Sequence, residues 1–224
     1  MKEFLSHLAE GVYDKGIFKA FFLAGGPGSG KTFVTQNVFA GSGLKLVNSD
    51  QQFERKLIAA DYSLSMPPEE IKGREIIRQS AKRLTNDLMT NYLMGRLGVI
   101  VDGTARNYPL IERQVQLLRT TLGYDCYMVF INTSLDVALE RNAGRIRRVP
   151  VDVTKQSWKT VQRNMGKFQY LFGRKNFVIV DNNNANEDIL KKVGKKIKTM
   201  MSNPIQSFTA KRWIVNQLKA KRRA

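Results

Sequence analysis

The chain of 224 residues has little cysteine and no long hydrophobic run. A membrane-spanning helix needs about 20 consecutive apolar residues, and no stretch of this sequence approaches that length. The N-terminal segment MKEFLSHLAEGVYDKG carries acids and too short an apolar stretch for a secretory signal, so we expect a cytoplasmic protein. The single cysteine, Cys126, agrees with that setting. Its place in DCYMVFIN predicts packing in a buried strand rather than a reactive thiol.

Acidic residues are also scarce, with 19 Asp and Glu against 37 Lys and Arg, which leaves a net charge of +18. Such an excess favours polyanionic partners. No acid follows Asp188, whereas the segments KKVGKKIKTM and TAKRWIVNQLKAKRRA are rich in lysine and arginine. We expect this basic C-terminal arm to bind nucleic acid. A solvated helix face with a solubilising tail is the alternative.

Other bulk properties are ordinary, because 42% of the residues are hydrophobic and 25% are charged, as in a globular protein. Apolar runs bounded by turn residues alternate with longer stretches of helical period, which is typical of βαβ units around a parallel sheet. The strand candidates are residues 17–25, 44–48, 98–103, 126–132 and 176–181. Their Val, Ile and Phe content suits strands covered on both faces. The sequence therefore predicts an α/β fold with a doubly wound, five-stranded parallel sheet and helices on both faces.

Helices are expected between these strands. Residues 67–96 predict one long amphipathic helix, and Ser134 is the expected N-cap of the helix that begins SLDVALERN. The apolar residues at near-helical spacing in the first of these segments are Ile76, Ile77, Leu84, Leu88 and Leu93. In a third segment, residues 186–201, apolar residues fall four apart at Ile189, Val193, Ile197 and Met201. Asn203-Pro204 breaks the pattern, so we expect one domain over residues 1–203 and the basic arm over 204–224.

A glycine-rich loop between the first strand and the following helix carries the strongest chemical signal. It fits the pattern G-x-x-x-x-G-K-[ST] over Gly25, Gly26, Pro27, Gly28, Ser29, Gly30, Lys31 and Thr32. The backbone N–H groups of such a loop face phosphate oxygens, and the N-terminus of the next helix adds its partial positive charge. We expect Lys31 to bridge the β- and γ-phosphates of a nucleoside triphosphate and the Thr32 hydroxyl to bind Mg²⁺.

Polar residues follow the second and third strands, at the sheet edge where doubly wound folds bind their ligands. Asp50, in VNSDQQ, is either a general base for an attacking hydroxyl or the cap of the helix that follows it. VIVDGT delivers Asp102 and Thr104 to the same edge. Asp102 is expected to hold Mg²⁺ through water or to fix another side chain, and a plain turn at Asp-Gly is the competing interpretation.

Arginines crowd the segment ALERNAGRIRRVPVDV, which contains a glycine and leads into a proline. They are Arg141, Arg145, Arg147 and Arg148. Arginines that close over a phosphoryl-transfer site stabilise the charge that develops on the transferred oxygens. The segment is therefore predicted to be a lid over about residues 141–150, with an ordinary basic surface loop as the alternative.

The P-loop, the Asn-x-Asp after the second strand, the third strand ending near Asp-x-Thr and the segment RNAGRIRRVPVDV together resemble the bacteriophage polynucleotide 5′-kinases. These enzymes fall within a wider group of small P-loop kinases that includes zeta-toxin-like enzymes. The resemblance covers about residues 18–180. It implies ATP and Mg²⁺ as cofactors, Lys31 and Thr32 as their ligands and Asp50 as the general base. It further implies that Arg145 contacts the phosphates and that Arg141 supports it from the lid.

The chain departs from the family at the acceptor side. The family places an arginine three residues past its catalytic aspartate, whereas this chain has Phe53 there and its nearest arginine is Arg55. Together with Thr104, these are the expected acceptor-binding residues. Three functions remain open: a kinase acting on the 5′-hydroxyl of DNA or RNA, a small-molecule kinase in which Phe53 packs against a compact acceptor, and a nucleotide-gated nucleic-acid binder without catalysis.

The family resemblance does not cover the arm after Pro204. Within SFTAKRWIVNQLKAKRRA, the helical period places Phe208, Val215 and Leu218 on one face. The cations distributed around and beyond that face are Lys211, Lys219, Lys221, Arg222 and Arg223. We expect the apolar face to dock on the domain and hold the cations outward, with Trp213 able to stack on a base. A basic amphipathic helix lying on an anionic membrane surface is the alternative.

Overall fold

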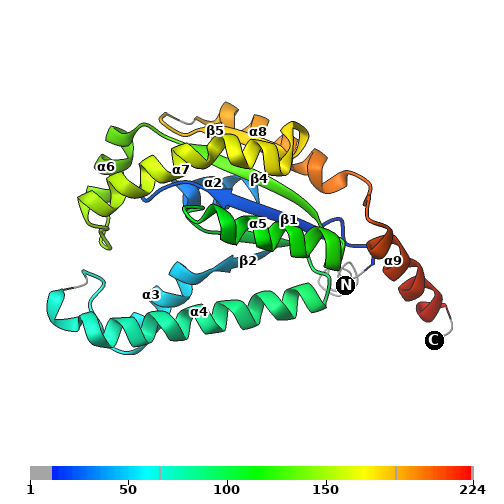
Figure 1. Cartoon of the computed structure of the whole chain (residues 1–224), viewed down its shortest axis with the longest axis horizontal. Helices are drawn as coiled ribbons and strands as arrows, with labels where there is room; N and C mark the ends of the chain where they lie inside the picture. Colours follow the sequence, from blue (N-terminus) through cyan, green and yellow to red (C-terminus); the bar gives the residue numbers. More distant parts are fainter. Residues whose placement is uncertain (1–11, 66, 185, 223–224) are drawn as a thin grey trace.

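A computed structural model describes residues 12–65, 67–184 and 186–222. Its centre is a sheet of five parallel strands, in the spatial order β2-β3-β1-β4-β5 (Figure 1). The strands are β1 (Lys19–Ala24), β2 (Lys45–Asn48), β3 (Val99–Asp102), β4 (Asp125–Asn132) and β5 (Phe177–Asp181). Each lies inside or within one residue of a predicted strand, so the predicted sheet is confirmed.

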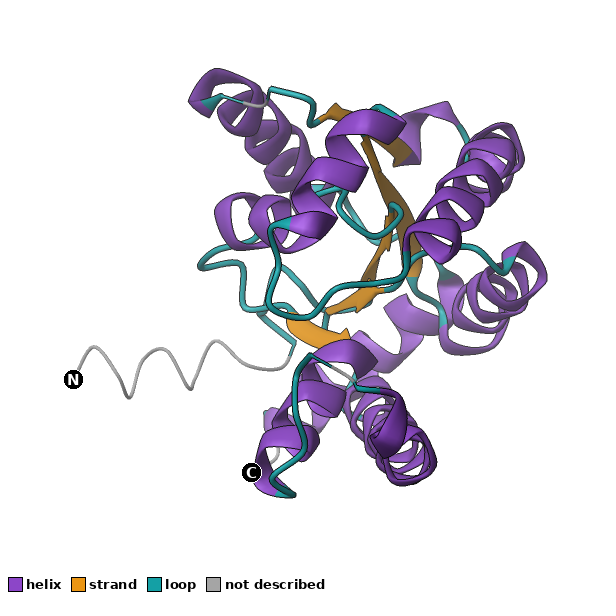
Figure 2. Cartoon of the chain, turned by 90° about the vertical axis from the view of Figure 1, so that its left-hand side faces the viewer, coloured by secondary structure: helices purple, strands orange, loops and turns teal. Residues whose placement is uncertain are grey.

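Side chains alternate between the two faces of the sheet. Helices cover both of these faces (Figure 2). On one face, Phe21, Leu23 and Val129 pack against α2 (Lys31–Val38) and α8 (Glu187–Ser202). On the other, Phe22, Met128 and Phe130 pack against α5 (Tyr108–Gln116), its π-helical continuation η2 (Leu117–Leu122) and α7 (Val151–Phe172). The apolar strands are therefore buried on both sides, as parallel strands require.

Two helices extend from the β2 edge. The chain leaves β2 directly into α3 (Ser49–Ala59) and returns through a 3₁₀ turn, η1 (Pro68–Glu70), and α4 (Ile71–Met94). The long helix predicted here is confirmed, but its buried face differs from the apolar pattern. Ile76 is 68% exposed and Leu84 is 38% exposed, whereas the small residues Ala81 and Thr85 are buried. Small side chains are buried because α3 packs closely on α4 through the cluster that contains Ala81.

The remaining elements are α6 (Leu135–Ala143), the 3₁₀ turn η3 (Arg174–Asn176) and α9 (Phe208–Lys221). The Ser134 hydroxyl accepts a hydrogen bond from the Val137 N–H at the start of α6, so the predicted N-cap is confirmed. Cys126 is buried in β4, and burial raises the pKa of its thiol to about 12, which agrees with a packing role. Among the described residues, no helix is long and apolar enough to cross a membrane.

Helix α9 contradicts the predicted apolar face of the arm. Phe208 is 77% exposed and Val215 is 48% exposed. The helix instead docks through Ala210, Trp213 and Ile214, whose i, i+3, i+4 spacing forms a different face. The Trp213 ring makes an edge contact with Phe18, with 5.5 Å between ring centroids, so this indole packs against the core, and the base-stacking role expected for it stays a prediction.

The arm also lies far from the P-loop. Phe18 precedes β1, so α9 packs at the amino ends of the strands, whereas the P-loop follows their carboxyl ends (Figure 1). α8 ends at Ser202 and Asn203 is its C-cap, as the sequence predicts. The division into a 1–203 domain and a 204–224 arm stays a prediction, and Arg223, counted among the arm's cations, lies outside the described residues.

Candidate active site

The P-loop connects β1 to α2, and two of its glycines are required by close packing. Gly28 and Gly30 have φ values of 78° and 83°, which favour glycine. A Cβ on Gly28 would overlap the backbone of Ala138 in α6, and one on Gly30 would overlap the side chain of Asn182. Gly30 is also the N-cap of α2 and offers no capping side chain, so the first N–H groups of this helix remain free to bind an anion.

Lys31 lies folded into the loop that precedes it. Its Nζ donates hydrogen bonds to the carbonyl oxygens of Gly25 and Gly26, at 2.6 and 3.2 Å. Burial lowers the pKa of this ammonium group, the nearby positive charge of Arg145 lowers it further, and the Asp102 carboxylate opposes both. The lysine, the lid arginine and the aspartate that ends β3 are therefore neighbours in space although they lie far apart in the sequence.

Asn182, which the sequence analysis missed, fixes the P-loop from the end of β5. Its Nδ2 donates to the Ser29 carbonyl at 2.7 Å, and the residue is 2% exposed. Arg141 in turn donates to the carbonyl oxygens of Asn182 and Asn183 at 2.7 and 2.9 Å. The polar run DNNN at the end of the fifth strand was the sequence signal that could have indicated Asn182 as a site residue. Arg141 ties the lid helix to the β5–α8 loop, and its expected support of the phosphate-binding arginine stays a prediction.

The start of α3 answers the question that the sequence left open for Asp50. The N-cap of α3 is Asn48, whose Oδ1 accepts from the N–H groups of Asp50 and Gln51 at 2.8 and 3.1 Å. Capping by Asp50 is therefore wrong. The Asp50 side chain is 55% exposed and stays available for chemistry.

Asp102 holds the side chain that caps α3. Its Oδ2 accepts from Asn48 Nδ2 at 2.6 Å, which corresponds to the prediction that it fixes another side chain. Its Oδ1 is buried and has no hydrogen-bond partner among the described residues. Burial raises the pKa of this carboxyl group, while the Lys31 charge opposes that rise. The carboxylate thus has one oxygen committed to Asn48 and one free.

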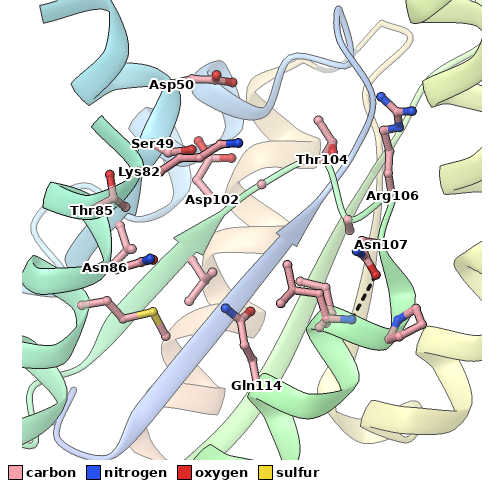
Figure 3. A pocket seen from close by; sticks show the side chains of 18 of the residues that line it. Ser49, Asp50, Lys82, Thr85, Asn86, Asp102, Thr104, Arg106, Asn107 and Gln114 are labelled. Atoms are coloured by element: carbon pink, nitrogen blue, oxygen red, sulfur yellow. Dashed lines mark hydrogen bonds between the residues drawn. The ribbon is translucent and has the colours of Figure 1, made fainter. Parts of the chain in front are cut away.

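A pocket of about 970 Å³ opens beside these residues, between α3, α4, β3 and α5 (Figure 3). Asp50, Asp102 and Thr104 lie at one end of it, as predicted from the strand ends. Its further polar lining comprises Ser49, Lys82, Thr85, Asn86, Arg106, Asn107, Gln114 and Thr160. The α4 residues, and the β3–α5 residues other than Thr104, were missed because no motif marks them.

The two residues expected to bind the acceptor from α3 do not line this pocket. Phe53 is 1% exposed and packs with Leu57 and Ala81, while the Arg78 guanidinium lies 4.3 Å from its ring centroid. Its predicted contact with an acceptor is therefore wrong, because the α3–α4 contact covers the ring. Arg55 is exposed on α3, outside the pocket lining.

The lid segment forms a closed arch between α6 and α7. The buried Asn142 side chain donates to the Val149 carbonyl at 2.6 Å and accepts from the Val149 N–H at 3.1 Å. These two hydrogen bonds hold the ends of the arch together. Arg147 leaves the arch toward α3, where its Nε lies 2.7 Å from Glu54 Oε1 and its Nη2 lies 3.6 Å from Asp50 Oδ2. The sequence did not distinguish Arg147 from its neighbours, because no local pattern places it opposite Glu54.

Comparison with known proteins agrees with this architecture. Residues 21–168 match a family model described as an AAA domain. A candidate kinase from Chloroflexus aurantiacus superposes with a TM-score of 0.59 at 16% identity, covering 82% of this chain and 95% of that one. A shikimate kinase from Acinetobacter baumannii gives 0.54 at 15% identity, covering 87% and 99%. A gluconokinase from Sinorhizobium meliloti gives 0.51 at 16% identity, covering 84% and 95%. The chain therefore has the P-loop kinase fold.

Proposed function

Because the chain belongs to the AAA domain family whose model spans residues 21–168, we propose that it is an ATP-dependent phosphotransferase acting on a hydroxyl acceptor. One observation carries this proposal: the exposed carboxylate of Asp50 faces the same site as the P-loop lysine and opens onto the pocket of about 970 Å³. A nucleotide-binding loop with an adjacent base and an adjacent acceptor pocket has the parts that phosphoryl transfer needs.

The nucleotide is proposed to bind through the residues that the P-loop motif predicts. The P-loop from Gly25 to Gly30 supplies backbone N–H groups for the phosphates, and Lys31 exchanges its bonds to the loop carbonyls for bonds to the β- and γ-phosphate oxygens. Arg145 lies close enough to Lys31 to lower its pKa, and it has no ion-pair partner among the described residues. We assign it to the transferred phosphoryl group, where its planar fork matches the oxygens.

A divalent cation fits the residues present. Asp102 Oδ1 is a buried carboxylate oxygen without a partner among the described residues, and the exposed Thr32 side chain stands in the first turn of α2. Mg²⁺ takes few protein ligands and completes its shell with water and phosphate oxygens. These two residues would hold it directly or through water. When bound, Mg²⁺ neutralises charge on the phosphate oxygens.

Asp50 is proposed as the general base. It takes the proton of the acceptor hydroxyl as the hydroxyl oxygen forms its bond to the γ-phosphorus, and the bond from that phosphorus to the β–γ bridging oxygen breaks to release ADP. Asn48 and Asp102 position this base, because their hydrogen bonds fix the first turn of α3 on the edge of β3. The products are ADP and a phosphate monoester of the acceptor.

For the acceptor we propose the 5′-hydroxyl end of DNA or RNA, with the residues of the β3–α5 loop beside it. The net charge of +18 and the open pocket with two cations support a polyanionic acceptor. A small hydroxylated molecule is the second candidate, and the apolar floor formed by Val47, Met89 and Ile111 favours it. A nucleotide-gated binder without catalysis is less well supported, because it has no use for an exposed carboxylate held at the nucleotide site.

An acceptor screen tests this proposal. The purified chain is incubated with γ-labelled ATP and Mg²⁺ against 5′-hydroxyl oligonucleotides, nucleosides, nucleotides, gluconate and shikimate, and labelled products are separated. We expect transfer to a hydroxyl acceptor, and we expect Lys31→Ala to abolish it by removing the charged contact to the β- and γ-phosphate oxygens. Undiminished transfer by Lys31→Ala, or no transfer by the native chain to any acceptor, contradicts the proposal.

A further inference from the structure

A single buried amide on α7 holds the turn between β3 and α5. Asn164 is 7% exposed, and its Nδ2 donates hydrogen bonds to the carbonyl oxygens of Ala105 and Arg106, at 3.2 and 3.0 Å. An amide nitrogen carries two hydrogens, so this group commits both of its donors to the turn. No motif marks Asn164, and the turn that it binds lies far from it in the sequence.

The turn borders the pocket and has a backbone conformation that needs support. Residues 103–107 line the pocket, and Figure 3 shows Arg106 and Asn107 across it from Asp50. Ala105 has a φ of 58°, in the left-handed region that residues with a Cβ rarely adopt. Such a conformation persists only where surrounding contacts enforce it, and the carbonyl of this residue is one of the two that Asn164 binds.

The helix that carries Asn164 is itself anchored to the sheet. Trp158 Nε1 donates to the Thr133 carbonyl at 2.8 Å, and Gln162 Nε2 donates to Asn132 Oδ1 at 2.8 Å. Asn132 is the last residue of β4, and Thr133 follows it. Because α7 is fixed in this way, its buried amide imposes a position on the turn.

The turn is joined more loosely to the P-loop than to α7. The Gly25 N–H donates to the Thr104 carbonyl at 3.4 Å, which is a long hydrogen bond. At the other end of the turn, the side chain and carbonyl of Asn107 accept from the N–H groups of Leu110 and Ile111 at the start of α5. A displaced turn should therefore alter the pocket more than the nucleotide loop.

We propose that Asn164 is a positioning residue for the acceptor, because its two hydrogen bonds hold the turn at the wall of the pocket that faces Asp50. The inference rests on the proposed function, which makes the occupant of this pocket the acceptor. Asn164 does not line the pocket and acts through the turn that it binds.

The first test is amide hydrogen exchange of the unliganded protein, which requires no catalysis. The N–H groups of Gly25, Leu110 and Ile111 report on the turn, because their acceptor atoms belong to it. We expect Asn164→Ala to speed exchange at these three amides by about 10-fold, since it removes two neutral hydrogen bonds that fix the turn. Native exchange rates at all three amides overturn the proposal.

Asn176→Ala is the matched control. The Asn176 Nδ2 also donates to a backbone carbonyl of α7, that of Phe172 at 3.1 Å, but Asn176 lies outside the lining of the pocket. This variant loses a comparable contact and should leave the three reporter amides at their native rates. Equal acceleration in Asn164→Ala and Asn176→Ala would show a general loss of stability and overturn the positioning role.

The second test separates the two substrates by steady-state kinetics, with ATP and the acceptor that is phosphorylated fastest in the screen. Asn164→Ala should raise the KM for the acceptor by about 10-fold and leave the KM for ATP within about 2-fold of the native value. Asn176→Ala should leave both KM values unchanged. An unchanged acceptor KM in Asn164→Ala, or an equal rise in the two KM values, overturns the proposal.

Two further variants grade the effect. Asn164→Ser keeps one donor and should raise the acceptor KM by only about 3-fold. Adding Ala105→Gly to Asn164→Ala should recover about 3-fold of the lost acceptor KM, because glycine adopts a φ of 58° without the steric cost of a Cβ. A merely structural role for Asn164 predicts no such recovery, so its absence contradicts the inference.

Failure of this inference is separable from failure of the proposed function. A native protein that transfers no phosphoryl group, with faster exchange at the reporter amides in Asn164→Ala, would refute the kinase and keep the hold of Asn164 on the turn. A native protein that transfers phosphate, with an unchanged acceptor KM in Asn164→Ala, would keep the kinase and refute the positioning role.

Discussion

The lid contact made by Arg147 leads to a sharp prediction for Glu54→Gln. In the structure, Arg147 Nε lies 2.7 Å from Glu54 Oε1, and the side chains are 18% and 43% exposed. The neighbouring Asp50 carboxylate lies farther from the same guanidinium, at 3.6 Å. Glu54 is therefore the main counter-ion that holds the lid arch against α3, and it draws Arg147 away from the proposed base.

The free energy that this ion pair contributes follows from its geometry. Exposed ion pairs contribute about 0.2–1 kcal/mol, and the largely buried arginine and short distance place this pair near the upper end of that range, at about 1 kcal/mol. Since 1.4 kcal/mol is a tenfold change in an equilibrium constant, Glu54→Gln should raise the population with an open lid by about 5-fold. The change removes the charge but keeps the shape of the side chain.

Limited proteolysis measures that population, because trypsin requires a locally opened segment and cuts after Arg145, Arg147 or Arg148 faster when the arch opens. We expect cleavage at these sites to be about 5-fold faster in Glu54→Gln. Glu75→Gln provides the same charge change on the exposed face of α4 and should cut at the native rate. Equal cleavage of Glu54→Gln and the native chain would refute the assignment of this ion pair as the latch of the lid.

Three other substitutions test further parts of the site and fold. Asp50→Asn should keep nucleotide affinity while lowering turnover by roughly 10²–10⁴-fold; a collapse of nucleotide affinity in binding assays would make Asp50 structural. Arg145→Lys should lose much of the rate because lysine cannot reproduce the planar fork, and near-normal turnover would reduce the residue to a point charge. Trp213→Ala should lower the free energy of unfolding by about 3 kcal/mol in denaturant titrations, because its ring packs on Phe18, with turnover unchanged; unchanged stability would contradict the docking of α9.

The local sequence was sufficient to predict the strands of the sheet and the P-loop. Strands buried on both faces are continuous apolar runs, so their positions follow from composition over four to eight residues. The P-loop is likewise a local pattern, because its glycines and its lysine are adjacent in the chain. The parallel arrangement brings the ends of β1, β2 and β3 to one edge of the sheet. For that reason the strand pattern alone predicts that Asp50, Asp102 and Thr104 lie near Lys31.

The acceptor side depended on how helices pack, which no single segment encodes. Phe53 is three residues from Asp50, yet the packing of α3 on α4 buries its ring and leaves Asp50 exposed. The same packing determines that Lys82, rather than Arg83, lines the pocket. Tertiary packing also decides which residues of α9 are buried. Phe208 and Trp213 are both aromatic residues of this helix, but Phe208 is exposed and Trp213 contacts Phe18.

The sequence by itself therefore determined the order of the strands along the chain, the triphosphate loop and the excess of positive charge. The tertiary structure decided which cations face the pocket, which arginine holds the lid and which face of α9 docks. The physical reason is that strand formation and phosphate loops depend on neighbours in the chain. The direction and burial of a side chain on a helix depend on contacts with residues far away in the sequence, as between Arg147 and Glu54 or between Trp213 and Phe18.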